Sequence, residues 1–425
     1  MTEYESTLQR IYGLRGGVID LRLDRMERAL SLFGHPEKAF PAFHIAGTNG
    51  KGSTAAMLHR ILTAAGYRTA LYTSPHLVSF TERIRVGEDE IAPEEVVALD
   101  REIRERTKDA VPLTFFEFVT VMAFVHFARC GAELAVVEVG LGGRLDATNL
   151  VFPLVSLITT VSMDHEAYLG SDLASIAAEK GGIIKEEIPV VCGLLPPEAQ
   201  SVVERIARER RAPLHMLGRE FSFTLKNDAD FDYKGPDWVL ENLSLALMGR
   251  HQRRNAAVAL AALEQVRKHW PVDEGAIRAG LRNVVWPGRL EILRQRPAVV
   301  LDGAHNGEGI RTLVEEMRSF RGARKVKVLF ASMADKDWRL MLDELGTVAD
   351  ELILTRVRME RSASPDLLAA HLGEKIPRRV VEDPETAVRT LIAELGPDDV
   401  GLVAGSLYLL GEVRPVIQRL LAASG

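Results

Sequence analysis

A glycine-rich stretch near the N-terminus contains residue types that suit phosphate binding. Residues 44–54 read HIAGTNGKGST, between an apolar lead-in and an amphipathic run. Glycines let the backbone turn its N–H groups inward, and a helix that follows adds the positive end of its dipole. Lys51 offers a point charge to the β- and γ-phosphates, and Ser53 or Thr54 a hydroxyl to Mg²⁺. The pattern therefore predicts a strand, a phosphate-binding loop and a helix.

The match to the strict phosphate-loop pattern is imperfect. Ile45 stands where the pattern has its first glycine, and Gly52 separates Lys51 from the hydroxyl. The alternative is an ordinary Gly-rich turn in which Ser53 caps the helix. Because glycines, a lysine and a helical pattern occur together, phosphate binding is the favoured interpretation.

Three polar residues are expected beyond the carboxyl ends of other strands, where α/β sheets bind ligands. They are Ser74, Glu138 and His165. Glu138 interrupts an apolar run, and a buried carboxylate is costly unless a metal ion or another cation compensates it. A metal site and a structural ion pair with an arginine both remain open. His165 is equally compatible with a core histidine, since Mg²⁺ prefers oxygen ligands.

Lys180 ends a predicted helix over 172–180, just before Gly181 and Gly182. A lysine in the last turn complements the helix dipole and caps the end. Taken by itself, the local sequence favours this structural role.

A second loop of interest follows an apolar strand further along the chain. Asp302 to Asn306 reads DGAHN, and its place after the strand parallels that of the first loop. We expect it to face a cleft between two domains. Asn255, in a predicted helix, and Arg289 are candidates for binding a nucleotide base, ribose or phosphate, although such residues are also common on surfaces.

The elements that must position these residues alternate between strand and helix. Residues 1–40 have a helical pattern, and 81–86 form an exposed charged segment. Strands are predicted at 69–73, 133–139, 154–160 and 190–194, and helices at 114–128, 172–180 and 251–282. This pattern predicts a P-loop-type, mostly parallel α/β sheet with flanking helices.

A domain boundary is expected at Trp286-Pro287-Gly288-Arg289, after which the alternation restarts. The later strands are predicted near 298–303, 325–331, 351–357, 379–382 and 399–404. The chain should therefore comprise an ATP-binding domain at 1–288 and a smaller, Rossmann-like α/β domain at 289–425.

Length and composition fit this division. At 425 residues the chain is too long for one ordinary core. A net charge of −6 argues against non-specific nucleic-acid binding. The charged N-terminus is not a signal peptide, and the most apolar window, 115–128, is too short to span a membrane. The two cysteines, Cys130 and Cys192, are expected to be buried thiols in a reducing cytoplasm.

Together these segments resemble the folylpolyglutamate synthase/dihydrofolate synthase family of the Mur ligase superfamily. The resemblance runs from residue 44 to residue 414. One departure is Gly307, where the family commonly has proline after DGAHN. The matching stretches are HIAGTNGKGST, SPHL with ERIRV, FFEF, EVGLGGRLDATN, DHEAYLG with IAAEKGGIIK, PGRLE, LDGAHN and GSLYLLGEVR.

The resemblance implies an ATP-dependent amide ligase with its active site between two domains. It implies that Ser74, Glu138 and His165 bind Mg²⁺. It also implies that Lys180 is carbamylated and helps to organise a second Mg²⁺, which reverses the capping interpretation. Lys51, Lys180 and His165 are the expected catalytic residues. The resemblance assigns pterin binding to Phe116 and Ala147. It assigns further ATP contacts to Asn255, Arg289, Asp302 and His305. The residues that it assigns to triphosphate binding are Gly47, Thr48, Asn49, Gly50, Lys51, Gly52, Ser53 and Thr54.

The implied reaction joins L-glutamate to dihydropteroate or to a reduced folate through an acyl phosphate. It is expected in a cytoplasmic monomer that binds neither nucleic acid nor a membrane. A Mur-type peptidoglycan-precursor ligase would share the ATP and Mg²⁺ machinery, but FFEF and GLGGRLDATN favour the folate branch. A P-loop regulatory ATPase would leave Glu138 and Lys180 without a role.

Overall fold

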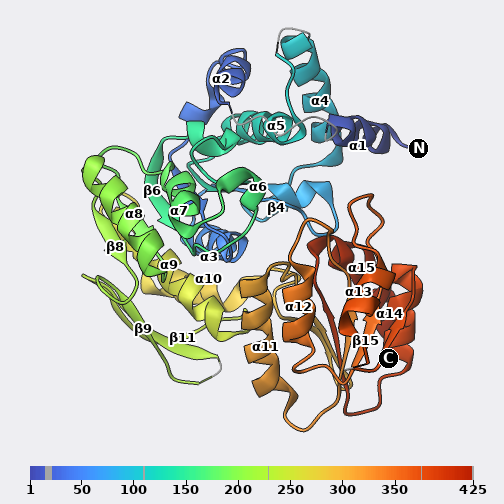
Figure 1. The fold of residues 1–425 in the computed structure, drawn as a ribbon. Helices are drawn as coiled ribbons and strands as arrows, with labels where there is room; N and C mark the ends of the chain where they lie inside the picture. The colour runs from blue at the N-terminus through green and yellow to red at the C-terminus, as the bar shows by residue number, and fades with distance from the viewer. Residues whose placement is uncertain (15–21, 109–110, 228, 375, 424–425) are drawn as a thin grey trace. The chain divides into compact units, whose positions relative to one another are not determined.

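The computed structural model describes residues 1–14, 22–108, 111–227, 229–374 and 376–423 (Figure 1). The chain forms two compact units. The first comprises Met1–Ala246 and Gln252–Val284, and the second Leu247–His251 and Val285–Gly425. The expected boundary between residues 288 and 289 lies a few residues beyond Val284 and remains a prediction.

The first unit contains an eight-stranded sheet in the order β4-β3-β2-β5-β1-β6-β7-β8. From β2 to β8 all neighbours are parallel, and only the edge strands β3 and β4 are antiparallel. The predicted parallel-rich sheet is confirmed. The strands are β1 (Ala42–Ala46), β2 (Thr69–Tyr72), β3 (Ile84–Val86), β4 (Asp89–Glu90), β5 (Leu134–Glu138), β6 (Pro153–Ile158), β7 (Val190–Cys192) and β8 (Leu214–Met216).

Strand β1 lies at the centre of this sheet, and its register positions the site. Ile45 pairs with Glu138 of β5, and Ala46 pairs with Ile158 of β6. Because the three strands are parallel, the loops that follow them emerge at one edge. Every residue of β1 and β5 is buried, as expected for strands covered on both faces.

Helices connect these strands (Figure 1). They are α1 (Glu3–Gly13), α2 (Asp24–Ser31), α3 (Lys51–Ala64), α4 (Pro93–Thr107), α5 (Phe115–Arg129), α6 (Glu166–Leu169), α7 (Leu173–Gly181), α8 (Pro197–Glu209), α9 (Arg250–Val266) and α10 (Glu274–Asn283). Short 3-10 turns are η2 (Pro36–Lys38), η3 (Phe80–Arg83) and η5 (Ala147–Leu150). Part of the predicted helical stretch 1–40, residues 15–21, lies outside the described residues.

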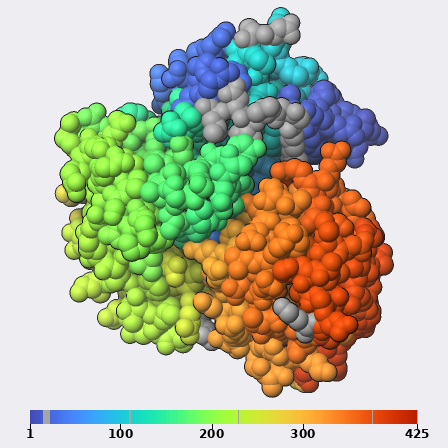
Figure 2. Space-filling model, in the orientation of Figure 1, coloured from blue at the N-terminus to red at the C-terminus, as the bar shows by residue number. Residues whose placement is uncertain are grey.

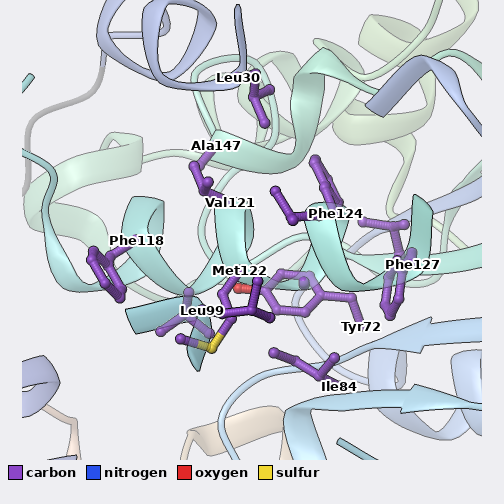
Figure 3. Close-up of a cluster of buried hydrophobic side chains, with 14 of the residues drawn as sticks. Leu30, Tyr72, Ile84, Leu99, Phe118, Val121, Met122, Phe124, Phe127 and Ala147 are labelled. Atoms are coloured by element: carbon purple, nitrogen blue, oxygen red, sulfur yellow. The ribbon is translucent and has the colours of Figure 1, made fainter. Parts of the chain in front are cut away.

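The core beside β2 and β5 is organised around α5 (Figure 3). Thr114 and Glu117 form a capping box that starts this helix. The ring of Phe124 packs edge-on against Tyr72 of β2, with 6.4 Å between centroids. Ala147, from the loop after β5, belongs to the same cluster. The apolar core therefore anchors a loop that the sequence assigns to substrate binding.

A small antiparallel sheet was not predicted. It consists of β9 (Ser222–Leu225), β10 (Asp230–Lys234) and β11 (Val239–Ser244), in the order β11-β10-β9. The signal was the alternation in β10, where Phe231 and Tyr233 are fully buried between more exposed aspartates. The Tyr233 hydroxyl donates to Glu264 of α9 over 2.8 Å, which ties the sheet to that helix.

The second unit has a six-stranded sheet in the order β12-β13-β17-β14-β15-β16. All pairings are parallel except that of the edge strand β12. The predicted smaller α/β domain is thus confirmed as a fold. Its elements are β12 (Glu291–Gln295), β13 (Ala298–Leu301), β14 (Val326–Phe330), β15 (Glu351–Leu354), β16 (Arg378–Val380), β17 (Val400–Ala404), α11 (Gly307–Arg321), α12 (Trp338–Leu345), α13 (Pro365–Leu372), α14 (Pro384–Ala393) and α15 (Leu407–Ala423).

One expectation about exposure was wrong. Residues 81–86 were expected to be an exposed charged segment, but none of them is exposed. The reason is that Arg83 is satisfied internally: its Nε donates to Nδ1 of His76 over 2.7 Å, and its guanidinium lies over the Phe115 ring. Cys192 is buried as expected, whereas Cys130 is only partly buried.

In the space-filling view, the first unit is drawn mainly in blue, cyan and green and the second in orange and red (Figure 2). Among the described residues, no helix combines the length and apolar character needed to cross a membrane.

Candidate functional site

The glycine-rich loop occupies the turn between β1 and α3. Gly50 has a φ of 86° and stands at the N-cap of α3, a conformation that favours glycine. A Cβ atom at this position would lie 2.6 Å from Oδ1 of Asn255. Asn255 is only 5% exposed and packs against the loop. The sequence alone left open whether this residue is a nucleotide contact or an ordinary surface residue. The Asn255 amide also donates to Oε1 of Gln252 over 3.1 Å.

Lys51 is the first residue of α3, and its side chain curls over the loop. Its ammonium donates to the carbonyl oxygens of Gly47 and Thr48 over 2.9 and 3.0 Å. This contact holds the positive charge beside the turn in which a phosphate would lie. Ser53 is buried at 2% exposure, and the fully buried Thr54 Oγ1 has no hydrogen-bond partner.

Glu138 and Ser74 meet at the ends of β5 and β2. Glu138 is the last residue of β5 and only 5% exposed. Its Oε2 accepts a hydrogen bond from the backbone N–H of Ser74 over 3.0 Å. The parallel pairing of the two strands thus brings together two of the predicted metal ligands.

His165 follows β6 on an exposed turn. It has a φ of 52° and its side chain is 39% exposed, so the core-histidine interpretation is wrong. The preceding Asp164 has a side chain only 9% exposed, and its Oδ1 accepts the His165 N–H over 2.9 Å. Sequence reasoning did not single out Asp164; its signal was a carboxylate beside a histidine directly after a buried strand.

Lys180 is almost entirely buried, at 3% exposure, in the last turn of α7. Its pKa is lowered to about 7, chiefly by burial and then by the positive charge of Lys51, while the negative charge of Asp164 opposes both effects. A side chain so little solvated does not suit the role of a capping cation. The fold therefore gathers Lys51, Asp164 and Lys180 near one another.

The predicted pterin residues share one hydrophobic cluster. Phe116 packs closely on the loop after β5. Its ring lies so near Gly140 that a Cβ atom at this position would be only 2.5 Å from it. Asp146, which sequence reasoning did not propose, shapes this loop. Its Oδ2 accepts the N–H groups of Gly140 and Leu141 over 3.0 and 2.9 Å, and Oδ1 accepts that of Thr148 over 3.0 Å. Burial raises the pKa of the Asp146 carboxyl, which these hydrogen bonds oppose.

In the second unit, the loop after β13 brings three predicted residues together. Both carboxylate oxygens of Asp302 accept backbone N–H groups, from Leu290 and from Ala304, each over 2.8 Å. His305 Nδ1 contacts the Gly303 carbonyl oxygen over 2.8 Å. The Arg289 guanidinium lies so close to Gly303 that a side chain there would overlap it.

The metal-binding potential of the described residues depends on mixed donors. No group of three or more His, Cys, Asp or Glu residues in this part of the chain is arranged to hold a metal ion. At the strand ends, the potential oxygen donors are the Glu138 carboxylate and the Ser74 hydroxyl.

Family models match most of the chain. Residues 45–263 match the Mur ligase middle domain, and residues 288–407 match the Mur ligase, glutamate ligase domain. The dihydrofolate synthase/folylpolyglutamate synthase of Bacillus subtilis is 36% identical, covering 97% of this chain and 99% of that protein. The Escherichia coli protein of the same name is 35% identical over 97% of this chain and 95% of its own length.

Solved structures agree with these matches. Escherichia coli FolC in complex with DHPP and ADP has a TM-score of 0.92 and 35% identity, covering 99% of this chain and 98% of that one. The Yersinia pestis bifunctional folylpolyglutamate synthase/dihydrofolate synthase, complexed with AMPPNP and Mn ion, has a TM-score of 0.89 and 32% identity over 98% of each chain. The predicted resemblance is confirmed, and the chain belongs to the folylpolyglutamate synthase/dihydrofolate synthase family of Mur ligases.

Proposed function

We propose that this protein is an ATP-dependent ligase that joins L-glutamate to the carboxylate of a pteroate or folate. The observation that carries the proposal is the convergence of the phosphate loop, Glu138 and Lys180 at one sheet edge in a chain of this family. Relatives named for the folate activities favour it over a peptidoglycan-precursor ligase and over a regulatory ATPase.

The reaction requires two anions to meet. A substrate carboxylate attacks the γ-phosphate of ATP and forms an acyl phosphate, which the amine of L-glutamate then attacks. Coulomb repulsion opposes the first step unless positive charge is held in place beforehand. Lys51 supplies such a charge, because its ammonium already rests on the loop carbonyls.

The donor types at the strand ends support Mg²⁺ binding. Glu138 and Ser74 would provide the oxygen atoms that this ion prefers, and His165 would provide a nitrogen. We propose that these three residues hold one Mg²⁺ and that carbamylated Lys180 helps to hold a second. The bound ions would supply positive charge opposite the triphosphate.

The environment of Lys180 supports carbamylation. Only the neutral amine attacks CO₂; a C–N bond forms and a proton is released. A pKa of about 7 leaves a large neutral fraction at physiological pH, whereas an ordinary lysine has very little. The carbamate carries a negative charge. A negative charge near the Lys51 ammonium is electrostatically more favourable than the second positive charge of an unmodified, protonated Lys180.

The remaining predicted contacts complete the proposal. Asn255, which packs beside Gly50, would bind the nucleotide, and Arg289, Asp302 and His305 are further proposed nucleotide contacts. Phe116 and Ala147 would bind the pterin. We further propose both activities, on dihydropteroate and on reduced folate, in a cytoplasmic monomer that acts on small molecules without nucleic acid or a membrane.

Phosphate release from ATP tests the function. With the purified protein, we expect release only when L-glutamate and either dihydropteroate or tetrahydrofolate are both present. Lys51→Ala should lower the rate at least about 100-fold, as loss of a charge-stabilising donor does. Radiolabelled glutamate shows which acceptor is extended. Release that ignores both substrates would instead identify a regulatory ATPase.

A further inference from the structure

The phosphate loop rests on the segment Thr159–Ser162, which follows β6. The backbone N–H of Thr48 donates to the Thr160 carbonyl over 2.9 Å. The N–H of Asn49 donates to the Thr160 hydroxyl over 3.0 Å. Two N–H groups of the loop are therefore directed at the segment after β6, so the phosphate donors must come from further along the turn.

The hydroxyl of Thr159 fills the space beneath the loop. It donates to the carbonyl oxygen of Asn49 over 2.6 Å, and Thr159 itself is 1% exposed. A Cβ at Gly47 would overlap this hydroxyl. Gly47 is thus required by a neighbouring strand as well as by the loop conformation.

A reciprocal pair closes the contact. The hydroxyl of Thr48 donates to the Ser162 carbonyl over 3.2 Å and accepts the Ser162 N–H over 3.0 Å. Thr48 was expected to contact phosphate, but its hydroxyl is engaged with the segment that runs directly into Asp164 and His165. The loop and this segment are therefore tied together by side-chain as well as backbone hydrogen bonds.

We propose that Thr159, Thr160 and the Thr48–Ser162 pair form a clamp that holds the phosphate loop in register with the Asp164–His165 turn. The proposal rests on nucleotide binding at this loop, which is part of the proposed function. The Thr160 hydroxyl acts as a positioning group, because it holds the Asn49 backbone and thereby sets the orientation of the first turn of α3. Without it the loop would sample orientations in which fewer donors face a phosphate.

Isosteric substitution tests the clamp in the full-length protein. Thr160→Val removes the hydroxyl and keeps the backbone carbonyl that binds Thr48. We expect calorimetric titration with MgADP to show about tenfold weaker binding, the scale of one lost buried hydrogen bond. Thr160→Ser restores the hydroxyl and should bind within about twofold of the wild-type protein.

Thr355→Val is the matched control. Like Thr160, Thr355 is a buried threonine in the segment just after a parallel strand, and its hydroxyl donates to the Glu382 carbonyl over 3.0 Å. A purely structural threonine should lower the melting temperature and leave MgADP affinity unchanged. We therefore expect a change in affinity for Thr160→Val and none for Thr355→Val.

Three results would overturn the clamp. They are wild-type affinity in Thr160→Val, failure of Thr160→Ser to restore binding, and an equal loss of affinity in Thr355→Val. If Thr160→Val does not fold, Thr48→Val removes the Ser162 bonds and is judged by the same tenfold criterion. Titration of MgADP needs no folate, so a wild-type protein that binds MgADP but ligates no glutamate would refute the proposed function and leave the clamp intact.

Discussion

Burial changes the chemistry of single side chains at this site. Lys180 and Glu138 are both nearly inaccessible to water, yet each carries a group that is charged in solution. Desolvation disfavours the ammonium form of Lys180 and brings its pKa to about 7. The same residue at the surface would be an ordinary capping cation.

Replacing Lys180 tests its modification. Lys180→Ala should lose ligase activity by about 100-fold or more, because the proposed carbamate is absent. Formate or acetate should restore part of the rate, since a small carboxylate can occupy the space and charge of a carbamate. The measurement is glutamate ligation with and without added carboxylate. A fully active Lys180→Ala enzyme would return the residue to a capping role.

The pKa of Lys180 also predicts a pH dependence. Below about pH 7 the buried amine is increasingly protonated and cannot accept CO₂, so the wild-type rate at limiting bicarbonate should fall as the pH drops from 7.5 to 6. Formate stays ionised over this range. Formate-rescued Lys180→Ala should therefore lack this fall, and a parallel decline in both proteins would place the titrating group elsewhere.

At the scale of elements, ion pairs brace the turn that carries Arg289. Glu291 Oε2 accepts the Gly288 N–H over 2.9 Å, and Arg414 of α15 grips both carboxylate oxygens of Glu291, over 2.6 and 3.0 Å. Both side chains of the pair are 18% exposed. The sequence motifs PGRLE and GSLYLLGEVR are thus joined by one contact between β12 and α15.

Breaking this brace should affect nucleotide binding. We expect Arg414→Met to raise the KM for ATP about tenfold while kcat changes less than about threefold, because a buried charge loses its partner and the Arg289 turn loosens. Arg379→Met is the control, since Arg379 lies in β16, at the opposite edge of the same sheet from β12, and the substitution breaks its ion pairs with Glu351 and Glu394. Equal effects of the two substitutions on KM would contradict the role of the brace.

At the scale of the whole molecule, each unit has its own hydrophobic core. One cluster surrounds α5 and includes Phe124, and another in the second unit includes Phe330. Both phenylalanines are fully buried. A chain with separate cores can unfold in separate steps.

Two core substitutions test this independence. Phe124→Ala and Phe330→Ala should each cost about 3–5 kcal/mol, as the loss of a buried aromatic ring does. In differential scanning calorimetry, we expect each variant to lower the transition of its own unit and leave the other within about a degree. A single transition that both substitutions shift equally would show that the units unfold together.

Much of this protein was determined by local sequence. Near-continuous apolar runs, alternating with helical patterns, predicted the parallel strands, and the motifs predicted the family, because both depend on short-range patterns of residue type. The small sheet β9–β11 was missed because its Phe231 and Tyr233 become core residues only when packed against the rest of the unit.

Only the tertiary structure decided how the candidate site works. The sequence allowed Lys180 to be a solvated cap, His165 a core residue and 81–86 an exposed segment; burial or exposure decided each against that option. It could not show that Thr48 and Asn49 are bound by the segment after β6, more than a hundred residues further along the chain. Desolvation and long-range hydrogen bonding depend on neighbours in space, and residue type and spacing along the chain do not specify those neighbours.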